Sequence, residues 1–398
     1  MYKRQKEESV NTILEMAEYK KTGSCKVLVV TGCMAQRYKN EIIEEVPEVD
    51  AVLGTTSYGD ILKAIREAME GKHFQEFKDI DYLPEKLGKR VLTTGGHFGY
   101  LKIAEGCDKH CTYCIIPKLR GKFRSVPMER LVTQAKEMAE EGVKELILVA
   151  QETTVYGTDI YGKKSLHILL KELCKIKGIR WIRVLYCYPE EIYDELIQTM
   201  KEEKKICHYL DLPIQHASDR ILKRMGRRTT QAELVEIVNK LRREIPDIVL
   251  RTTLISGFPG ETQEDHEELM GFVDEMEFDR LGVFTYSPEE DTPAATMPDQ
   301  VAEEVKEARR DEIMELQQEI SYDKGTDRIG QELLVMIEGK VADESAYIGR
   351  TYGDAPKVDG YIFVQTGELL MTGDFAKVRV TGALEYDLIG ELADEYTE

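Results

Sequence analysis

The sequence predicts an α/β protein built in three parts, and three patterns along the chain support this prediction. Between Tyr100 and Tyr286, short apolar strands alternate with amphipathic helices, as they do in a parallel β/α barrel. Before residue 73 the same alternation occurs, but with fewer strands than a complete doubly wound domain needs. After Gly330 the hydrophobic period changes to two, which predicts a small antiparallel β-barrel of the OB type.

The first part, residues 1–73, opens on an amphipathic helix over residues 1–20. Two strands and two helices are predicted to follow, namely Cys25–Val30, a helix from Met34, Val52–Gly54 and Tyr58–Glu70. Because the chain begins on a helix and holds so few parallel strands, we expect that part of this domain is missing before residue 1. Residues 74–97 lack strong periodicity and are predicted to form a linker.

The second part, residues 98–323, is predicted to be a partial parallel barrel with a charged connector helix over Asp299–Tyr322. The first predicted strand of this part starts at Tyr100. The other predicted strands are Glu145–Ala150, Arg180–Tyr186, Tyr209–Leu212, Val249–Ile255 and Leu281–Tyr286. Its helices are predicted at Met128–Glu141, Leu166–Lys175, Glu190–Lys201, Thr230–Glu244 and Gln263–Met276. The third part, residues 324–398, has predicted strands at Leu333–Ile337, Ala346–Arg350, Tyr361–Val364, Ala376–Thr381 and Asp387–Glu391.

Composition narrows the class of protein. The 398 residues carry a formal net charge of −20, which argues against a simple basic nucleic-acid-binding protein. No apolar run approaches the length of a membrane span, and the basic N terminus is not followed by the apolar segment of a signal peptide. Eight cysteines in a chain of this length do not make a disulfide scaffold, so we expect a cytoplasmic protein in a reducing compartment.

Three cysteines gather in one short loop directly after the first barrel strand. Cys107, Cys111 and Cys114 are separated by three and then two residues. A structural zinc site usually takes four ligands in two pairs, whereas cysteine thiolates are the normal ligands of iron–sulfur clusters. Three thiolates on a four-iron cluster leave one iron open to a small molecule. The alternatives are cysteines gathered by chance or a partial zinc knuckle.

This loop resembles the cluster loop of the radical S-adenosylmethionine (SAM) enzymes. The resemblance implies that the open iron chelates the amino and carboxylate groups of SAM, and that an electron from the cluster cleaves the sulfonium to give a deoxyadenosyl radical. Tyr113 lies between the second and third cysteines. An aromatic residue there commonly packs near the adenine in such enzymes, although Tyr113 could equally shield the cluster.

Further candidate residues follow other predicted strands and would meet at one edge of the barrel. They are Gln151, Glu152, Gln215 and His216. His216 could transfer protons, but a structural histidine is the more frequent role. The loop Ser256-Gly257-Phe-Pro-Gly260-Glu261 permits close backbone approach and is a candidate for holding the ribose or carboxylate of SAM. A basic run after the cluster loop is either a solvated face or a rim that contacts substrate, and comprises Lys118, Arg120, Lys122 and Arg124.

Four segments together resemble the radical SAM methylthiotransferases, and most closely their RimO branch. They are Cys107–Arg124, Ala150–Gly157, Leu212–Ser218 and Ser287–Ala295. The resemblance covers essentially the whole chain. It implies a flavodoxin-like methylthiotransferase domain, a radical SAM barrel and a TRAM domain. The implied activity is methylthiolation of the β-carbon of an aspartate in small-subunit ribosomal protein S-twelve, with separate electron and sulfur donors.

The resemblance also implies a second, auxiliary four-iron cluster on three cysteines of the N-terminal domain. The segment Thr31–Tyr38 matches the stretch that bears the third of these, which is Cys33. The first two would lie before residue 1. The sequence therefore predicts an N-terminally shortened chain that cleaves SAM without completing methylthiolation, because one thiolate cannot replace three.

Two rival functions stay open at this point. One is a tRNA methylthiotransferase of the MiaB type, and the other is a non-catalytic iron–sulfur protein. Residues 326–398 hold 6 Lys and Arg against 15 Asp and Glu, a net charge of −9. A TRAM domain that grips RNA should be basic, whereas an acidic one suits a basic ribosomal protein. Direct RNA binding is therefore the weaker expectation.

Overall fold

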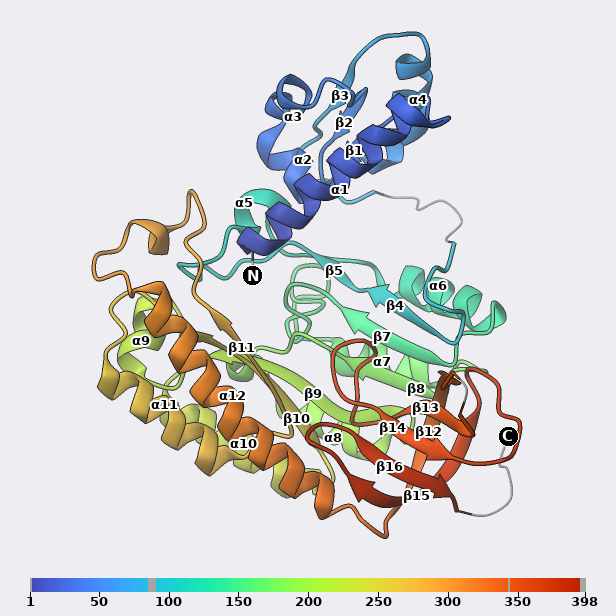
Figure 1. The fold of residues 1–398 in the computed structure, drawn as a ribbon, viewed down its shortest axis with the longest axis vertical. Coiled ribbons are helices and arrows are strands. Elements are labelled where there is room, and N and C mark those ends of the chain that lie inside the picture. Colours follow the sequence, from blue (N-terminus) through green and yellow to red (C-terminus); the bar gives the residue numbers. More distant parts are fainter. Residues whose placement is uncertain (1, 85–90, 343, 394–398) are drawn as a thin grey trace. The chain divides into compact units, whose positions relative to one another are not determined.

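The computed structural model describes residues 2–84, 91–342 and 344–393 (Figure 1). The chain divides into two compact units. The first unit comprises residues 1–91, 105–124 and 287–297, and the second comprises residues 92–104, 125–286 and 298–398. None of the helices in the described ranges combines the length and the apolar character that crossing a membrane requires.

The first unit contains a three-stranded parallel sheet in the order β1-β2-β3. Its elements are α1 (Tyr2–Thr22), β1 (Val29–Thr31), α2 (Cys33–Tyr38), α3 (Asn40–Glu45), β2 (Ala51–Leu53), η1 (Tyr58–Asp60), α4 (Ile61–Met69), β3 (Phe74–Glu76) and α5 (Ile116–Arg120). The predicted strand from Cys25 is shorter than expected, and β3 lies in the stretch that we predicted to be a linker. With only Phe74 as an apolar residue, β3 carries no detectable alternation.

The second unit is organised around six parallel strands in the order β11-β10-β9-β8-β7-β4. They are β4 (Phe98–Lys102), β7 (Glu145–Val149), β8 (Trp181–Val184), β9 (Ile206–Gln215), β10 (Val249–Ser256) and β11 (Arg280–Thr285). Consecutive strands are neighbours throughout, and β4 and β11 are the two edges, so the predicted partial parallel barrel is confirmed. Two short strands, β5 (Ala104–Glu105) and β6 (Arg124–Ser125), pair with each other on either side of the cysteine loop.

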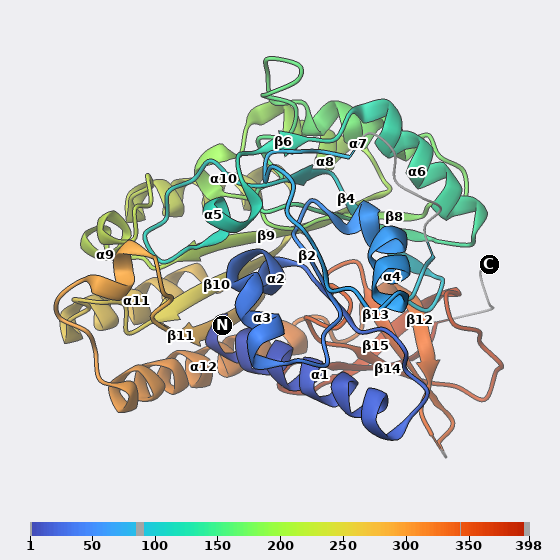
Figure 2. The ribbon, with the colours of Figure 1, turned by 90° about the horizontal axis from the view of Figure 1, so that it is seen from above.

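Helices between these strands cover the outer side of the curved sheet (Figure 2). They are α6 (Met128–Glu140), α7 (Leu166–Cys174), α8 (Asp194–Glu202), α9 (Asp219–Arg224), α10 (Gln231–Glu244) and α11 (Gln263–Met276), with η2 (Pro189–Glu191) before α8 and η3 (Pro293–Thr296) after β11. Five were predicted within a few residues, and α9 was missed. Capping boxes set the start of α10 at Thr230 and of α11 at Thr262.

The C-terminal strands form a closed five-stranded barrel that follows the long helix α12 (Glu303–Thr326). The strands are β12 (Glu332–Lys340), β13 (Ala346–Thr351), β14 (Ile362–Gln365), β15 (Phe375–Ala383) and β16 (Leu388–Leu392). Four neighbouring pairs are antiparallel as predicted, but β14 and β16 are parallel. Strand directions cannot alternate all the way around a closed ring with an odd number of strands, so one parallel pair is unavoidable.

The small barrel packs on the six-stranded sheet through a shared apolar cluster within the second unit. Trp181 on β8 meets Phe375 on β15 edge to face, with ring centroids 4.9 Å apart. Met336 on β12 packs into the same cluster as Val249 on β10. Burial of such large side chains stabilises the contact by about 1.5–3 kcal/mol for each fully buried residue. The sheet and the small barrel are therefore parts of one packed core.

Candidate functional site

The cysteine loop of the first unit is held in shape by backbone hydrogen bonds. Gly106 opens it with a φ of +76°, and a Cβ at this position would lie 2.1 Å from the carbonyl oxygen of Lys122. Only glycine fits such a conformation and such a close approach. Beyond it, the Cys107 amide donates to Gly121 O at 3.1 Å, and the Cys114 amide donates to Cys111 O at 3.1 Å. These hydrogen bonds therefore fix the backbone positions of Cys107 and Cys114.

The three thiols lie in a largely dry environment. Cys107 and Cys111 are buried, Cys114 is half-buried, and all three are free thiols. The Lys109 amide donates to Cys107 Sγ at 3.4 Å, which is the kind of contact that stabilises a metal-bound thiolate. Burial, together with the smaller effects of Cys111 and Cys107, outweighs a hydrogen bond with the Ile116 backbone and raises the pKa of the Cys114 thiol to about 12. A cation beside these sulfurs reverses that preference, because it stabilises the thiolates.

The chemistry of the donor set bears on which group the cysteine loop could hold. In the described residues, no three His, Cys, Asp or Glu side chains converge so that a single metal ion could bind them. A four-iron cluster gives each thiolate a separate iron, so its cysteines need not converge on one point. The donor set of the loop fits a cluster with one open iron.

Cys33, the predicted auxiliary ligand, is the first residue of α2 in the same unit. Its Sγ accepts a hydrogen bond from Arg120 Nε at 3.1 Å, and Arg120 also pairs with Glu105 at 3.3 Å. Arg120 is the last residue of α5, the helix that follows the cysteine loop. The structure thus connects Cys33 to that loop through one guanidinium. Cys25 lies elsewhere, with its Sγ directed at Val27 O.

The remaining basic residues after the loop also make contacts inside the first unit. Lys118 donates to Asp291 O at 2.7 Å, and Arg124 pairs with Asp81 at 3.2 Å. The side chains of Arg120 and Arg124 are only 23% and 13% exposed. Arg120 and Arg124 are therefore engaged by neighbouring groups, whereas Lys118 and Lys122 are exposed, and both interpretations of the run, a solvated face or a rim that contacts substrate, stay predictions.

In the second unit, the predicted strand-end residues lie at one edge of the sheet. Gln151 follows β7, Gln215 ends β9 and Ser256 ends β10, and all these strands are parallel. Gln151 Oε1 is buried and has no hydrogen-bond partner in the described part of the chain. An unsatisfied buried acceptor requires an explanation, and a ligand that donates to it is one. Glu152 instead accepts a hydrogen bond from the Thr154 amide at 2.9 Å, which stabilises the turn that contains both residues.

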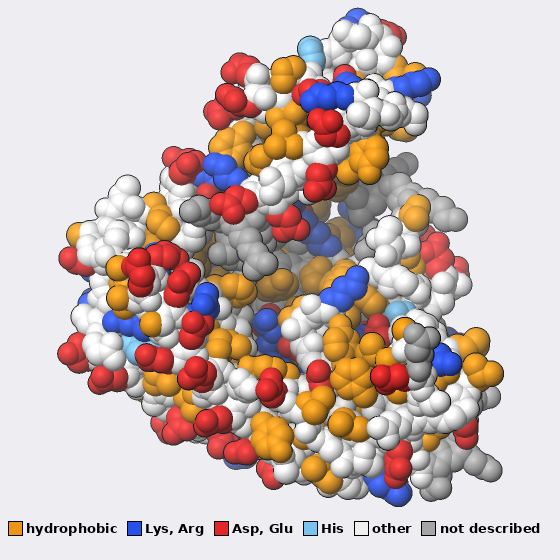
Figure 3. Space-filling model, in the orientation of Figure 1, with side chains coloured by type: hydrophobic (Ala, Val, Ile, Leu, Met, Phe, Trp, Pro, Cys, Tyr) orange, Lys and Arg blue, Asp and Glu red, His pale blue; other side chains and the backbone are white. Residues whose placement is uncertain are grey.

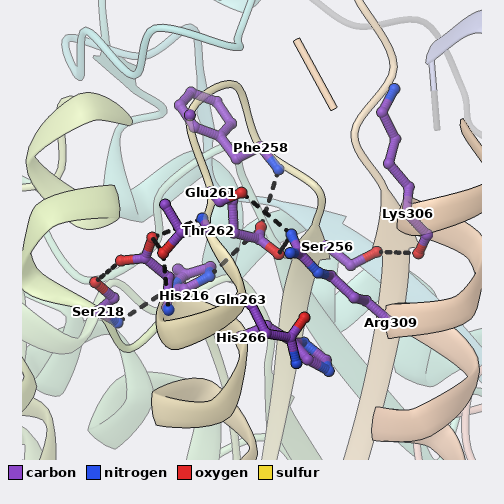
Figure 4. Close-up of polar contacts among 12 residues, drawn as sticks. His216, Ser218, Ser256, Phe258, Glu261, Thr262, Gln263, His266, Lys306 and Arg309 are labelled. Carbon is purple, nitrogen blue, oxygen red and sulfur yellow. Dashed lines mark hydrogen bonds and ion pairs between the residues drawn. The ribbon is translucent and has the colours of Figure 1, made fainter. Parts of the chain in front are cut away.

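Side chains of the loop Ser256–Glu261 make polar contacts with neighbouring residues, as Figure 4 shows. Ser256 Oγ donates to Lys306 O of α12 at 2.9 Å, so this hydroxyl is already used. Glu261 accepts from the Phe258 amide at 3.0 Å and from Arg309 Nη1 at 2.9 Å. Burial alone would raise the pKa of Glu261, but His216 and Arg309 outweigh it and hold the pKa below its ordinary value.

The two glycines of this loop make room for side chains of the same unit. A Cβ on Gly257 would lie 2.1 Å from Lys306 Cγ, and one on Gly260 would lie 2.8 Å from the Arg224 guanidinium carbon. Both residues have positive φ, +69° and +82°. Contact of this loop with SAM stays a prediction, in which Ser256 Oγ could only accept a hydrogen bond, because its proton is already donated to Lys306 O.

His216 is buried, and its contacts favour the structural role (Figure 4). Its Nδ1 accepts from the Ser218 amide at 3.0 Å, which leaves the proton of the neutral ring on Nε2. Nε2 lies 3.6 Å from Glu261 Oε2, and neither side chain is exposed. Nε2 has no hydrogen-bond partner among the described residues, so the ring is fixed through Nδ1 and by its burial.

Sequence reasoning missed the role of the segment Ser287–Ala295. In the first unit, Arg37 of α2 forms an ion pair with Glu289 and donates to Glu290 O at 3.0 Å. The Ala294 amide donates to Thr112 O, inside the cysteine loop, at 2.9 Å. This segment therefore supports both α2 and the cysteine loop. No local signal in the sequence predicts these contacts, because the partners lie more than 170 residues apart.

Comparison with known proteins gives three family matches along the chain. A model described as Uncharacterized protein family UPF0004 matches residues 1–54, the Radical SAM superfamily matches residues 101–273, and the TRAM domain matches residues 329–393. With the parallel sheet and the closed C-terminal barrel, these matches define a radical SAM protein with a TRAM domain.

Curated relatives carry the name ribosomal protein uS12 methylthiotransferase RimO. The protein of Lachnoclostridium phytofermentans is 66% identical over 385 residues, covering 97% of this chain and 88% of the relative. Those of Clostridium perfringens and Clostridioides difficile are 53% and 50% identical, covering 98% of this chain in each comparison and 87% and 88% of the relatives. The chain belongs to the RimO family of methylthiotransferases and is accordingly a transferase.

Proposed function

We propose that this chain uses SAM and an iron–sulfur cluster to methylthiolate the β-carbon of an aspartate in ribosomal protein S-twelve, the uS12 of its relatives' names. The single observation that carries the proposal is the cysteine loop, with three buried or half-buried free thiols on a fixed backbone. Identity of 50–66% to proteins of that name supports the same substrate.

In this proposal, Cys107, Cys111 and Cys114 hold the four-iron cluster that leaves one iron open. When bound, the cluster would supply the electron that cleaves SAM to a deoxyadenosyl radical. The chain's own residues bind and orient. Burial of Cys107 and Cys111 excludes water, and the Lys109 amide stabilises the sulfur of Cys107.

SAM is proposed to lie along the strand edge of the second unit. The unsatisfied Gln151 Oε1 can accept from an ammonium group, which matches the amino group of SAM. Gly257 and Gly260 expose backbone groups, because neither carries a Cβ. Tyr113, half-buried between two cysteines, supplies an aromatic surface for adenine or shields the cluster.

A basic protein partner is supported by the acidic charge of the surface. Some acidic groups of the C-terminal barrel are used in ion pairs, namely Glu338 with Arg350, Asp354 with Arg280 and Asp359 with Arg251. Others in the same barrel are exposed, including Glu368, Glu385 and Glu391. Exposed carboxylates also gather over α11 and α12, where Figure 3 shows many Asp and Glu side chains. Such a surface attracts a basic ribosomal protein and repels RNA.

The test uses the full chain, reconstituted anaerobically with iron and sulfide. We expect about four irons per chain from this loop and deoxyadenosine release from SAM after reduction. Methylthio-aspartate in uS12, measured by mass spectrometry, tests whether the residues of this chain suffice for sulfur transfer as well. Changing Cys107, Cys111 and Cys114 to Ala removes the iron and the deoxyadenosine. Cys174→Ala is the matched control, since Cys174 is a half-buried free thiol on α7.

Iron content and SAM cleavage that survive in the triple variant would show that the cluster lies elsewhere. Methylthiolation of tRNA in preference to uS12 would assign the chain to the MiaB type of activity. Iron binding without SAM cleavage would support a non-catalytic iron–sulfur protein. A loss of iron in Cys174→Ala would show that the triple variant reports general misfolding.

A further inference from the structure

Tyr186 follows β8 at the C-terminal edge of the sheet in a conformation that tyrosine rarely adopts. Its φ is +59°, in the left-handed region. For a bulky residue this conformation is a true outlier. The backbone strain costs about 1–3 kcal/mol of folding free energy, which a glycine at the same position would avoid. The side chain is nevertheless 47% exposed, so the strain does not serve to bury the ring.

Neighbouring strands hold the Tyr186 peptide in place from both sides. The Tyr186 amide donates to Asp211 Oδ2 of β9 at 3.2 Å, and the Thr153 amide, beyond β7, donates to Tyr186 O at 3.1 Å. Asp211 and Thr153 are both buried, and Asp211 is fixed by Arg251 at 2.7 Å. These contacts over-determine the backbone, which is how a strained residue persists in a folded protein.

A second strained residue lies on the adjacent strand. Gln215 ends β9 with a φ of +73°, and β8 and β9 are hydrogen-bonded neighbours. The other described non-glycine residues with positive φ are charged, and they are Lys39, Glu277, Asp291, Asp299 and Lys357. Tyr186 and Gln215 thus place two uncharged strained residues at the strand edge that carries the candidate site. In parallel β/α barrels the chemistry takes place at this edge.

The Tyr186 ring is available to a partner. Its hydroxyl has no hydrogen-bond partner among the residues that the structure describes. A half-exposed aromatic ring on a rigid backbone provides contact area at a low cost in conformational entropy. Its π-face attracts cations, and ribosomal proteins are rich in Lys and Arg.

We propose that Tyr186 is a substrate-contacting residue, whose ring packs against a Lys or Arg side chain of the uS12 segment that carries the target aspartate. This inference rests on the proposed function. The proposal explains why a strained tyrosine stands at a position where glycine would have less backbone strain. Glycine would keep the turn, but it would lose the ring. The strain at Tyr186 lowers the stability of the fold but holds the ring in a fixed position, and such a loss of stability is common at binding sites.

The experiment separates the ring from the strain. Tyr186→Ala removes the ring and keeps the strain, Tyr186→Gly removes both, and Tyr186→Phe removes only the hydroxyl. We expect Tyr186→Gly to melt at a higher temperature than Tyr186→Ala. Both should weaken binding of labelled uS12 about tenfold, measured by fluorescence anisotropy with the reconstituted full chain, and raise KM for uS12 in parallel. Tyr186→Phe should bind like the wild type.

Glu277→Gly is the matched control. Glu277 caps α11 with a φ of +42° and is exposed, so the glycine relieves the same kind of strain away from the strand edge. It should keep or raise the melting temperature and leave the uS12 affinity unchanged.

Three results would overturn the inference. Wild-type affinity for uS12 in both Tyr186→Ala and Tyr186→Gly would show that the ring makes no contact with the substrate. A raised KM for SAM with an unchanged KM for uS12 would assign the ring to SAM. If the wild-type chain neither binds nor modifies uS12, the proposed function fails and this inference fails with it, whereas the first two results leave the proposed function intact.

Discussion

Arg350 of the C-terminal barrel donates from Nη2 to Glu145 Oε2 across 2.7 Å, and neither side chain is exposed to solvent. The other carboxylate oxygen of Glu145, at the start of β7, accepts from Arg183 Nε of β8 at 2.8 Å. Burial alone would raise the pKa of Glu145, but the two guanidinium groups outweigh it and lower the pKa. One buried carboxylate therefore links the small barrel to the six-stranded sheet.

Removing the charge of Glu145 should destabilise the second unit severely. In Glu145→Gln the buried Arg183 guanidinium loses its carboxylate partner and Arg350 keeps only Glu338, and breaking a buried pair in this way typically costs about 3–5 kcal/mol. The midpoint of urea unfolding, followed by circular dichroism, measures the change. The control is Glu332→Gln, which breaks an exposed pair with Arg379 and should cost about 0.5 kcal/mol or less. Equal effects of the two substitutions would contradict this prediction.

A methyl group added at Gly257 should be far more costly than one added at Gly271. Gly257→Ala places Cβ against Lys306 in a strained conformation and should destabilise the unit by about 1–3 kcal/mol. Gly271→Ala meets open space in the exposed interior of α11, where alanine should stabilise the helix by about 0.5–1 kcal/mol. Thermal unfolding of both variants checks the opposite signs. A stabilised Gly257→Ala would show that Lys306 moves away freely.

The lowered pKa of Asp265 leads us to expect that this residue contributes to the free energy of unfolding in a pH-dependent way. Burial opposes its ionisation, but hydrogen bonds from Arg220, the Thr262 amide and Ser218 hold its pKa at about 2. Because the folded pKa lies below the unfolded value of about 3.9, the stabilisation is complete above pH 4 and is lost as the pH falls toward 2. Asp265→Asn should therefore lose about 1–2 kcal/mol at pH 6, where the capping box of α11 is intact.

The difference between Asp265→Asn and the wild type should shrink when urea unfolding is repeated between pH 4 and pH 2. Asp274→Asn, at an exposed carboxylate on the same helix, provides the comparison and should track the wild type at every pH. A loss in Asp265→Asn that stays constant down to pH 2 would show that the carboxylate acts through packing rather than through its charge.

Binding of uS12 should weaken as salt rises, because opposite charges attract over a Debye length of about 10 Å at 0.1 M ionic strength. We expect the steepest loss of affinity below about 0.15 M, measured by fluorescence anisotropy of labelled uS12. Charge reversal at the exposed α12 residues Glu307 and Asp311 should flatten this dependence. Tighter binding to tRNA than to uS12 at moderate salt would contradict the assignment of the partner.

Much of the second unit was predictable because its strands and helices carry local periodic signals. The apolar run Glu145–Val149 and the capped helix that starts at Thr230 each lie within one residue of their predicted bounds. Local patterns failed where the information is not local. β3 has a single apolar residue, and α9 is too short to show a period. The parallel pair of β14 and β16 follows from closing five strands into a ring.

The candidate site shows the same division. The cysteine loop could be recognised from the sequence, because all three predicted cluster ligands lie within eight residues. The hydrogen bond from Arg120 to Cys33 and the support of Thr112 by Ala294 could not, since nothing near either residue encodes the partner. The role expected for Ser256 stays a prediction, and its hydroxyl is already bonded to Lys306 O.

By itself, the sequence determined the order of the elements, the parallel character of the central sheet, the cysteine loop and the net charge. These properties depend on residue type and short-range spacing, which are fully present in a linear chain. Only the tertiary structure decided which charges are buried and which backbone is strained. In the C-terminal barrel, Asp359, Asp354 and Glu338 are engaged by Arg251, Arg280 and Arg350, whereas Glu368, Glu385 and Glu391 are exposed. Tyr186 takes its conformation from Asp211 and Thr153, because hydrogen bonds between distant residues exist only once the strands have paired.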